Sequence, residues 1–197
     1  MVGFNRRFAP HIVKAQQLLS DIAEPKCLIM TVNAGAIPLS HWTQDRDAGG
    51  GRLIGEGCHF VDLLRFLVGA PIADYEVRSI GRLVGGTSSD KFTLTLGFQD
   101  GSIGTVHYFA NGHRSLSKER LEIFCAGRVL QLDNFRTMSG FGWSGFRGMK
   151  LWRQDKGQRA CTEAFVNAVR HGASTPIPFE ELVEVSRVCI DAARSLG

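Results

Sequence analysis

The sequence predicts an α+β fold, a two-layer sandwich in which a large, open, mainly antiparallel sheet carries helices on one face. Residues 92–98 alternate apolar with small side chains, and the turn at 99–102 leads into a second strand that ends near Phe109. Residues 121–125 and 129–133 form another such pair. Because antiparallel strands with one apolar face need cover on that face only, the helices should lie together on one side.

The N-terminal elements follow in chain order. Residues 2–8 are predicted to form a short strand, and Pro10 suits the first turn of a helix that runs to about Ser20. Residues 27–33 are predicted to form a strand. The polar, glycine-rich loop at 34–51 follows, and loops of this length inside a compact domain are often functional.

A helix that starts at Arg52 carries a polar stripe. Arg52, Glu56, His59 and Asp62 recur three to four residues apart and therefore share one face. The apolar positions at helical spacing on the remaining surface are Ile54, Cys58, Val61, Leu64 and Val68. A polar stripe on a helix that is otherwise buried is predicted to face a cleft.

Two further helices are predicted at residues 159–171, where Gly172 stops the helix, and at 178–196. The 197 residues, with 44% hydrophobic and 21% charged content, suffice for one sizeable core. Residues 1–197 are therefore interpreted as a single domain.

His59 is the leading candidate for chemistry on the stripe. An imidazole exchanges a proton near neutral pH, and Glu56 lies one turn away to orient or charge it. The same pattern fits a structural histidine beside a solvated glutamate. The spacing does not distinguish these two interpretations.

Several classes of function are disfavoured. No apolar run reaches the roughly 18 residues that span a bilayer, and the charged N-terminus is not that of a signal peptide, so a cytoplasmic protein without membrane contact is expected. The five cysteines are scattered without C-x-x-C and are interpreted as reduced thiols. The histidines lack ligand spacing, which predicts no metal site. The net charge of +4 is modest and no nucleic-acid motif is present.

Residues 140–145 match the letters of the dinucleotide fingerprint G-x-G-x-x-G. They place bulky aromatic residues where the backbone would approach a phosphate, and they lead into no recognisable helix. We interpret them as a loop, so no cofactor-binding residue is predicted in this chain.

Three motifs carry a resemblance to a known family: VGFNRRF at residues 2–8, the glycine run at 49–51, and HFVDLLRFL at 59–67. With the order of elements, they resemble the C-terminal domain of the glucose-fructose oxidoreductase, inositol dehydrogenase and MocA family over essentially the whole chain. The resemblance implies a dihydrodipicolinate-reductase-like C-terminal domain. Family members are two-domain, nicotinamide-dependent sugar and polyol dehydrogenases.

The resemblance also implies roles for particular residues. It places His59 close to the substrate hydroxyl and the nicotinamide, as the catalytic candidate, and places Asn5 and Arg6 beside the cofactor, with Arg6 favoured as a substrate contact. The further substrate-binding candidates are Asn33, Trp42, Arg52 and Glu56. Arg6 could equally be a solvated basic strand end, and Trp42 could only pack the loop. Many members carry an acid or an amide where this chain has Gly55, so a histidine–acid pair would have to use Glu56.

A full family member begins with a dinucleotide-binding domain and carries a catalytic lysine in a Glu-Lys-Pro motif, and neither precedes Val2. The expected cofactor is therefore NAD or NADP in the intact enzyme, with none bound to this chain alone, which is expected to be inactive. The expected partners are the missing N-terminal domain, a small-molecule substrate and further copies of the chain, which would pair through the open sheet face at Thr93 and Thr95.

The sequence thus predicts the substrate-binding and oligomerisation domain of an NAD(P)-dependent oxidoreductase acting on a sugar, polyol or related hydroxyl compound. The alternative is a stand-alone, non-catalytic assembly or ligand-binding module that has lost the cofactor domain. Nothing in the chain separates the two.

Overall fold

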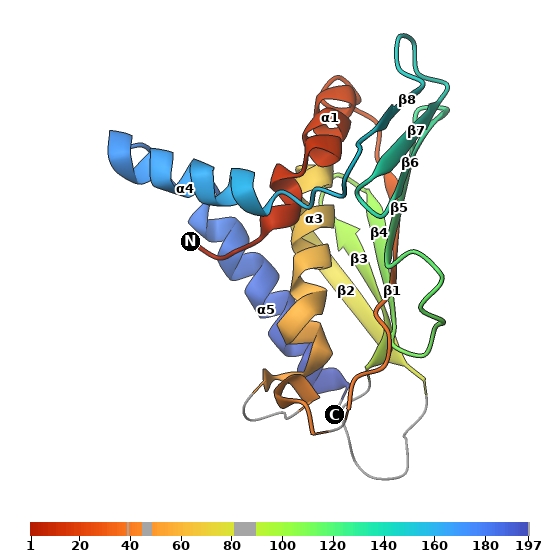
Figure 1. Cartoon of the computed structure of the whole chain (residues 1–197), viewed down its shortest axis with the longest axis vertical. Coiled ribbons are helices and arrows are strands. Elements are labelled where there is room, and N and C mark those ends of the chain that lie inside the picture. The colour runs from red at the N-terminus through yellow and green to blue at the C-terminus, as the bar shows by residue number, and fades with distance from the viewer. Residues whose placement is uncertain (39, 45–48, 81–89, 197) are drawn as a thin grey trace.

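The predicted α+β sandwich is confirmed by a computed structural model, which describes residues 1–38, 40–44, 49–80 and 90–196. Strands form one layer and the helices gather on one face of it (Figure 1). The sheet has the order β2-β3-β4-β1-β5-β6-β7-β8. It is mixed, because β1 pairs parallel with β4 while the other pairs are antiparallel.

The strands are β1 (Cys27–Asn33), β2 (Ile72–Ser79), β3 (Lys91–Phe98), β4 (Ile103–Phe109), β5 (Glu119–Cys125), β6 (Arg128–Asp133), β7 (Thr137–Phe141) and β8 (Gly148–Lys150). The α-helices are α1 (Pro10–Leu19), α3 (Cys58–Val68), α4 (Gln158–His171) and α5 (Phe179–Ser195). Shorter helical turns are η1 (Asn5–Phe8), η2 (Trp42–Gln44) and the π-helical turn η3 (Leu53–Gly57).

Most predicted elements lie within two residues of their expected bounds. Two helix ends coincide with the residues that predicted them. Pro10 occupies the first turn of α1, and Gly172 ends α4 with a φ of 58°. Strands β2, β7 and β8 were not among the predicted elements. They lie at the two ends of the sheet order. Residues 140–145, predicted to be a loop, contain the end of β7 and the turn towards β8. The predicted loop at 34–51 is described except for residues 39 and 45–48.

The prediction of a strand at residues 2–8 is wrong. Within this segment, Asn5–Phe8 form the 3-10 turn η1 before α1, and residues 2–4 form neither helix nor strand. A strand would send Arg6 and Arg7 to opposite faces, whereas both side chains are buried and paired with carboxylates. The tight turn allows both guanidinium groups to enter the interior.

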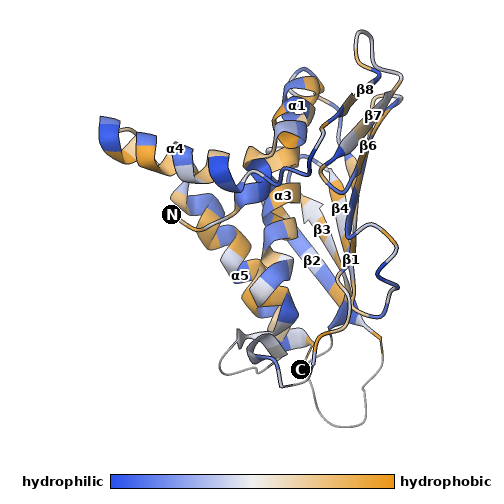
Figure 2. Ribbon diagram, in the orientation of Figure 1, coloured by the Kyte–Doolittle hydropathy of each residue, from blue (hydrophilic) through white to orange (hydrophobic). Residues whose placement is uncertain are grey.

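The core lies between α3 and the inner face of the sheet. Phe60, Leu63, Leu64 and Leu67 of α3 are fully buried or nearly so, and the inward residues of β3 and β4 are buried as well. Figure 2 shows the hydrophobic residues of α3 in orange. Because α3 is held so firmly, the residues at its N-terminal end have fixed positions.

Gly157, just before α4, lies against η1. Its φ is 82°, and a Cβ atom there would lie 2.4 Å from the carbonyl oxygen of Asn5 and 2.5 Å from the amide nitrogen of Ala9. Neither backbone atom can move without shifting η1. The glycine therefore lets α4 approach the turn that carries Arg6 and Arg7.

We expect Gly157→Ala to destabilise the fold by roughly 3 kcal/mol, because the strain of a positive φ adds to a backbone clash. The matched control is Gly145→Ala, which has a φ of 79° but no atom within 4 Å of the added Cβ, and which should cost about 1 kcal/mol. Urea unfolding of both variants measures the difference. Equal losses would show that the close packing at Gly157 contributes nothing.

No helix in the described part of the chain is both long and apolar enough to cross a membrane.

Candidate substrate site

A cavity of about 440 Å³ opens beside the N-terminal end of α3. It is lined by Arg6, Ala34, Ile37, His41, Thr43, Arg52, Gly55, Glu56, His59 and Lys118. These residues come from η1, the segment after β1, the turns η2 and η3, the start of α3 and the residue before β5. Segments far apart in the sequence thus form one concave surface, on which four of the ten lining residues are charged.

The turn η3 and its flanking residues bring three residues of the predicted polar stripe to this cavity: Arg52 just before η3, Glu56 within it and His59 at the start of α3. Arg52, Glu56 and His59 all line it, as expected of a stripe that faces a cleft. The fourth stripe residue, Asp62, is an exception: it is fully buried and pairs with Arg7 instead. Isolated π-helical turns inside helices occur frequently at functional sites.

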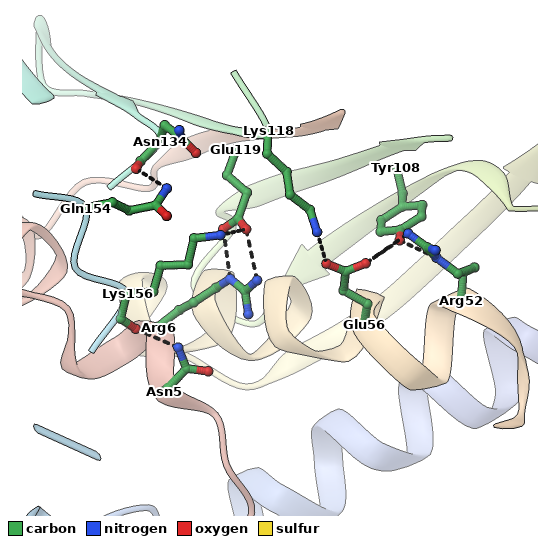
Figure 3. A network of polar contacts seen from close by, with 10 residues as sticks. All are labelled: Asn5, Arg6, Arg52, Glu56, Tyr108, Lys118, Glu119, Asn134, Gln154 and Lys156. Carbon is green, nitrogen blue, oxygen red and sulfur yellow. Dashed lines mark hydrogen bonds and ion pairs between the residues drawn. The ribbon is translucent and has the colours of Figure 1, made fainter. Parts of the chain in front are cut away.

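Glu56 is the centre of one hydrogen-bond network (Figure 3). It accepts from Lys118 Nζ at 2.6 Å, from the Tyr108 hydroxyl at 2.5 Å and from Arg52 Nη2 at 3.1 Å. Arg52 Nε donates to the Tyr108 oxygen at 2.6 Å. Burial alone would raise the pKa of Glu56, but the bonds from Lys118 and Tyr108 outweigh it and lower the pKa. Glu56 is therefore a carboxylate at neutral pH.

A second network holds Arg6 in place. Its Nε and Nη2 donate to the two carboxylate oxygens of Glu119 at 2.9 and 3.0 Å, and Lys156 Nζ lies 2.6 Å from the same carboxylate. Burial opposes the ionisation of Glu119, yet the bonds from Arg6 and Lys156 lower its pKa overall. The guanidinium also lies over the Phe60 ring, 4.5 Å from its centroid. The interpretation of Arg6 as a solvated strand end is wrong, since 6% of the residue is exposed.

His59 lines the cavity as a neutral ring. Burial and then the positive charge of Arg6 lower its pKa to about 4. Its ring packs edge-on against Phe4, with centroids 5.6 Å apart, and its buried Nδ1 makes no hydrogen bond with any described residue. Glu56 makes no hydrogen bond to it either, because that carboxylate is bound to Lys118, Tyr108 and Arg52.

The other predicted site residues lie elsewhere. Asn5 donates to the carbonyl oxygen of Lys156 at 2.6 Å, and Asn33 donates to the carbonyl oxygens of His113 and Leu116. Trp42 is 61% exposed and does not line the cavity, although its neighbours His41 and Thr43 do. The structure therefore gathers Arg6, Arg52, Glu56 and His59 and leaves Asn5, Asn33 and Trp42 outside.

Sequence reasoning missed Lys118, Tyr108 and Glu119. Tyr108 occupies an inward strand position typical of the core, and only its hydroxyl distinguishes it. Lys118 and Glu119 are adjacent at the start of β5, and this charge pair before an apolar strand was the available signal. Across the part of the chain that the structure describes, no cluster of three or more histidine, cysteine, aspartate or glutamate residues could hold a metal.

The comparisons with known proteins concern the family and the fold. A sequence profile described as the GFO/IDH/MocA C-terminal domain matches residues 16–130. A search of curated proteins found no match.

Three solved structures illustrate the structural similarity. An oxidoreductase domain protein from Kribbella flavida has a TM-score of 0.79 at 22% identity over 99% of this chain and 64% of that one. An aldose-aldose oxidoreductase from Caulobacter crescentus, complexed with glycerol, has a TM-score of 0.80 at 17% identity over 99% of this chain and 62% of that one. GenD2 from gentamicin A biosynthesis, in complex with NAD, has a TM-score of 0.75 at 21% identity over 98% of this chain and 60% of that one. This chain thus spans less than two thirds of each of these proteins.

Proposed function

The chain belongs to the GFO/IDH/MocA family of C-terminal domains, and from this we propose that it is the substrate-binding and oligomerisation domain of an NAD(P)-dependent oxidoreductase acting on a sugar, polyol or related hydroxyl compound. The observation that carries the proposal is the cavity of about 440 Å³ that His59, Glu56 and Arg52 line together. A concave site with a few convergent polar groups is suited to a small polar ligand.

His59 is the proposed contact to the reacting hydroxyl. A neutral imidazole with a pKa of about 4 accepts a hydrogen bond at pH 7. It is a weak base, so it holds a proton only weakly at that pH. The ring is therefore suited to orient the hydroxyl and to accept its hydrogen bond. Glu56 acts indirectly, as a positioning residue. Its carboxylate oxygens hold the side chains of Lys118, Tyr108 and Arg52 in place.

We place the binding of NAD or NADP on a dinucleotide-binding domain outside this chain. The letters G-x-G-x-x-G at residues 140–145 do not form the strand–turn–helix that cradles a pyrophosphate, since they end β7 and turn into β8. Residues 140–145 therefore do not fit the pyrophosphate of the cofactor, and we assign them no step through it. The GenD2 structure, which is complexed with NAD, supports a nicotinamide cofactor for the intact enzyme.

The substrate-binding role can be tested on this chain. Titration with D-glucose and myo-inositol should shift the NMR signals of the His59 ring. Gly55→Leu should abolish the shift, because Gly55 lines the cavity and the larger side chain would occupy it. A Cβ atom at Gly55 meets no atom closer than 3.8 Å, so the substitution is accommodated at that atom. The matched control, Ala160→Leu at an exposed position of α4, should bind normally. Binding that survives in Gly55→Leu would place the ligand elsewhere.

The open sheet face is the proposed oligomerisation surface. Ile103, Cys27 and Phe124 lie side by side on β4, β1 and β5, and all three are exposed. Thr95 and Thr105 form the neighbouring pair on β3 and β4, and their small side chains permit another sheet to approach. An apolar row on an uncovered sheet face is typical of a surface that a second copy covers.

We expect light scattering to show a dimer or larger assembly at micromolar concentration. Thr95→Arg should shift it towards the monomer, since an arginine would place a charge and a long side chain inside the interface. Gln17→Arg, at an exposed position of α1 on the other side of the molecule, is the matched control and should leave the assembly intact. A monomeric wild-type chain would contradict the proposal.

A further inference from the structure

Positive charge is in excess around the cavity. Three cationic side chains, those of Arg6, Arg52 and Lys118, line it together with one carboxylate, that of Glu56, so the described lining carries a charge of +2. Behind Arg6, Lys156 and Glu119 form an ion pair that adds no net charge. A site that only receives neutral sugars needs no such excess.

The cations also keep hydrogen-bond donors to spare. Arg6 uses Nε and Nη2 on Glu119, and Arg52 uses Nε and Nη2 on Tyr108 and Glu56. Nη1 of each guanidinium makes no hydrogen bond with a described residue, and Figure 3 shows Arg6 with one nitrogen outside the dashed contacts. Lys118 donates to Glu56, while 40% of its side chain remains exposed.

The chemistry of these donors is suited to an anion. Guanidinium groups bind carboxylates and phosphates through parallel N–H groups, and such charge-assisted bonds are about twice as strong as neutral ones. Both guanidinium groups are fixed beforehand by carboxylates and by aromatic rings, Arg6 over Phe60 and Arg52 over Tyr108. Little side-chain entropy remains to be lost when a ligand binds.

We propose that the substrate of this site carries an anionic group, a carboxylate or a phosphate, which Arg6, Arg52 and Lys118 bind while a hydroxyl group lies at His59. This inference rests on the proposed function and narrows its substrate class to acidic or phosphorylated hydroxyl compounds. The anion would also act on His59. Because the charge of Arg6 contributes to the low pKa of that ring, a bound anion should raise the pKa.

The experiment compares ligands that differ only at one carbon. D-glucose, D-glucuronate and glucose phosphorylated at its primary hydroxyl are titrated into the chain at constant ionic strength, with inorganic phosphate as the free anion, and the NMR signals of the His59 ring are followed. We expect at least one charged sugar to bind roughly tenfold or more tightly than glucose, a gain of about 1.4 kcal/mol, and to raise the pKa of His59.

Variants assign the effect to the cavity. Lys118→Gln should reduce the preference for the charged sugar over glucose, because it removes a lining cation that is partly exposed. Lys150→Gln, an exposed lysine of β8 outside the cavity, removes the same charge from the protein and should leave the preference unchanged. If the two variants reduced the preference equally, the preference for charged sugars would come from the net charge of the protein and not from the cavity, which would overturn the inference.

The remaining outcomes separate the sources of the anion. Tighter binding of glucuronate alone supports a carboxylate substrate, and tighter binding of the phosphate ester alone supports a phosphorylated one. If glucose binds as tightly as both charged sugars, the inference is overturned while the proposed function stands. If no sugar binds, both are overturned. Inorganic phosphate that binds as tightly as the ester would show an anion site without recognition of the sugar, which also overturns the inference.

Discussion

Replacing His59 with alanine is expected to lower kcat roughly 100-fold or more while KM changes less, in an enzyme where this chain follows a dinucleotide-binding domain. A residue that bonds to the reacting hydroxyl contributes most in the transition state, so its loss appears in kcat. The fold should survive, because the ring packs edge-on against Phe4 and such an aromatic pair is worth about 1 kcal/mol. The measurement is kcat and melting temperature on the same preparation.

The matched control is His171→Ala, an exposed histidine at the end of α4, which should leave both quantities unchanged. A structural role for His59 makes the opposite prediction, a lower melting temperature with ordinary turnover per folded molecule. A non-catalytic binding module predicts no turnover in the wild type. Each outcome points to one interpretation.

The same residue predicts a pH dependence. Burial and the charge of Arg6 lower the pKa of His59 to about 4, so the neutral ring persists as pH falls from 7 to 5. For the wild type acting on a neutral substrate, kcat should therefore not fall in that range through protonation of His59. A fall centred near the ordinary histidine pKa of about 6.5 would show that this ring titrates normally and contradict the environment described for it.

The largest loss of stability is expected for Asp62→Ala. Arg7 donates to Asp62 from Nε at 3.1 Å and from Nη2 at 2.5 Å, and it also donates to Glu181 at 2.9 Å. The Arg7 and Asp62 side chains are 4% and 1% exposed. Removal of Asp62 takes away the more deeply buried of the two carboxylates that pair with Arg7, and breaking a buried ion pair in this way costs about 3–5 kcal/mol. Because Arg7, Asp62 and Glu181 come from η1, α3 and α5, the two ion pairs of Arg7 hold those elements together.

Urea unfolding measures this loss. The control is Glu163→Ala, which breaks the ion pair with Arg159 on the surface of α4, where the arginine side chain is 90% exposed. That change should leave the free energy of unfolding almost unchanged, because exposed ion pairs contribute little. A second variant, Arg7→Met with Asp62→Leu, removes both charges and should recover much of the stability lost in Asp62→Ala. Similar losses in the free energy of unfolding for Asp62→Ala and Glu163→Ala would contradict the stabilising role of the buried ion pair between Arg7 and Asp62.

Local pattern was sufficient for much of the fold. The alternation at residues 92–98 fixes the faces of β3, because successive side chains of a strand point to opposite sides. Proline and glycine set the ends of helices, as at Pro10 and Gly172, because proline is restricted to a helical φ and lacks the N–H that a first turn leaves unpaired, and because glycine adopts a positive φ at little cost. The stripe of Arg52, Glu56 and His59 was likewise readable, since spacing of three and four residues places side chains on one face of any helix.

Only the tertiary structure decided which partners meet these residues. Residues 2–8 form a turn instead of a strand because Glu119 and Asp62, which lie 113 and 55 residues from their arginine partners, draw Arg6 and Arg7 inward. Glu56 contacts Lys118 and Tyr108, 62 and 52 residues away, rather than the nearby His59. The sequence determined which residue types lie on the stripe. Their charge states depend on burial and on partners from distant strands, because an ion pair forms wherever packing brings charges together, whatever their separation along the chain.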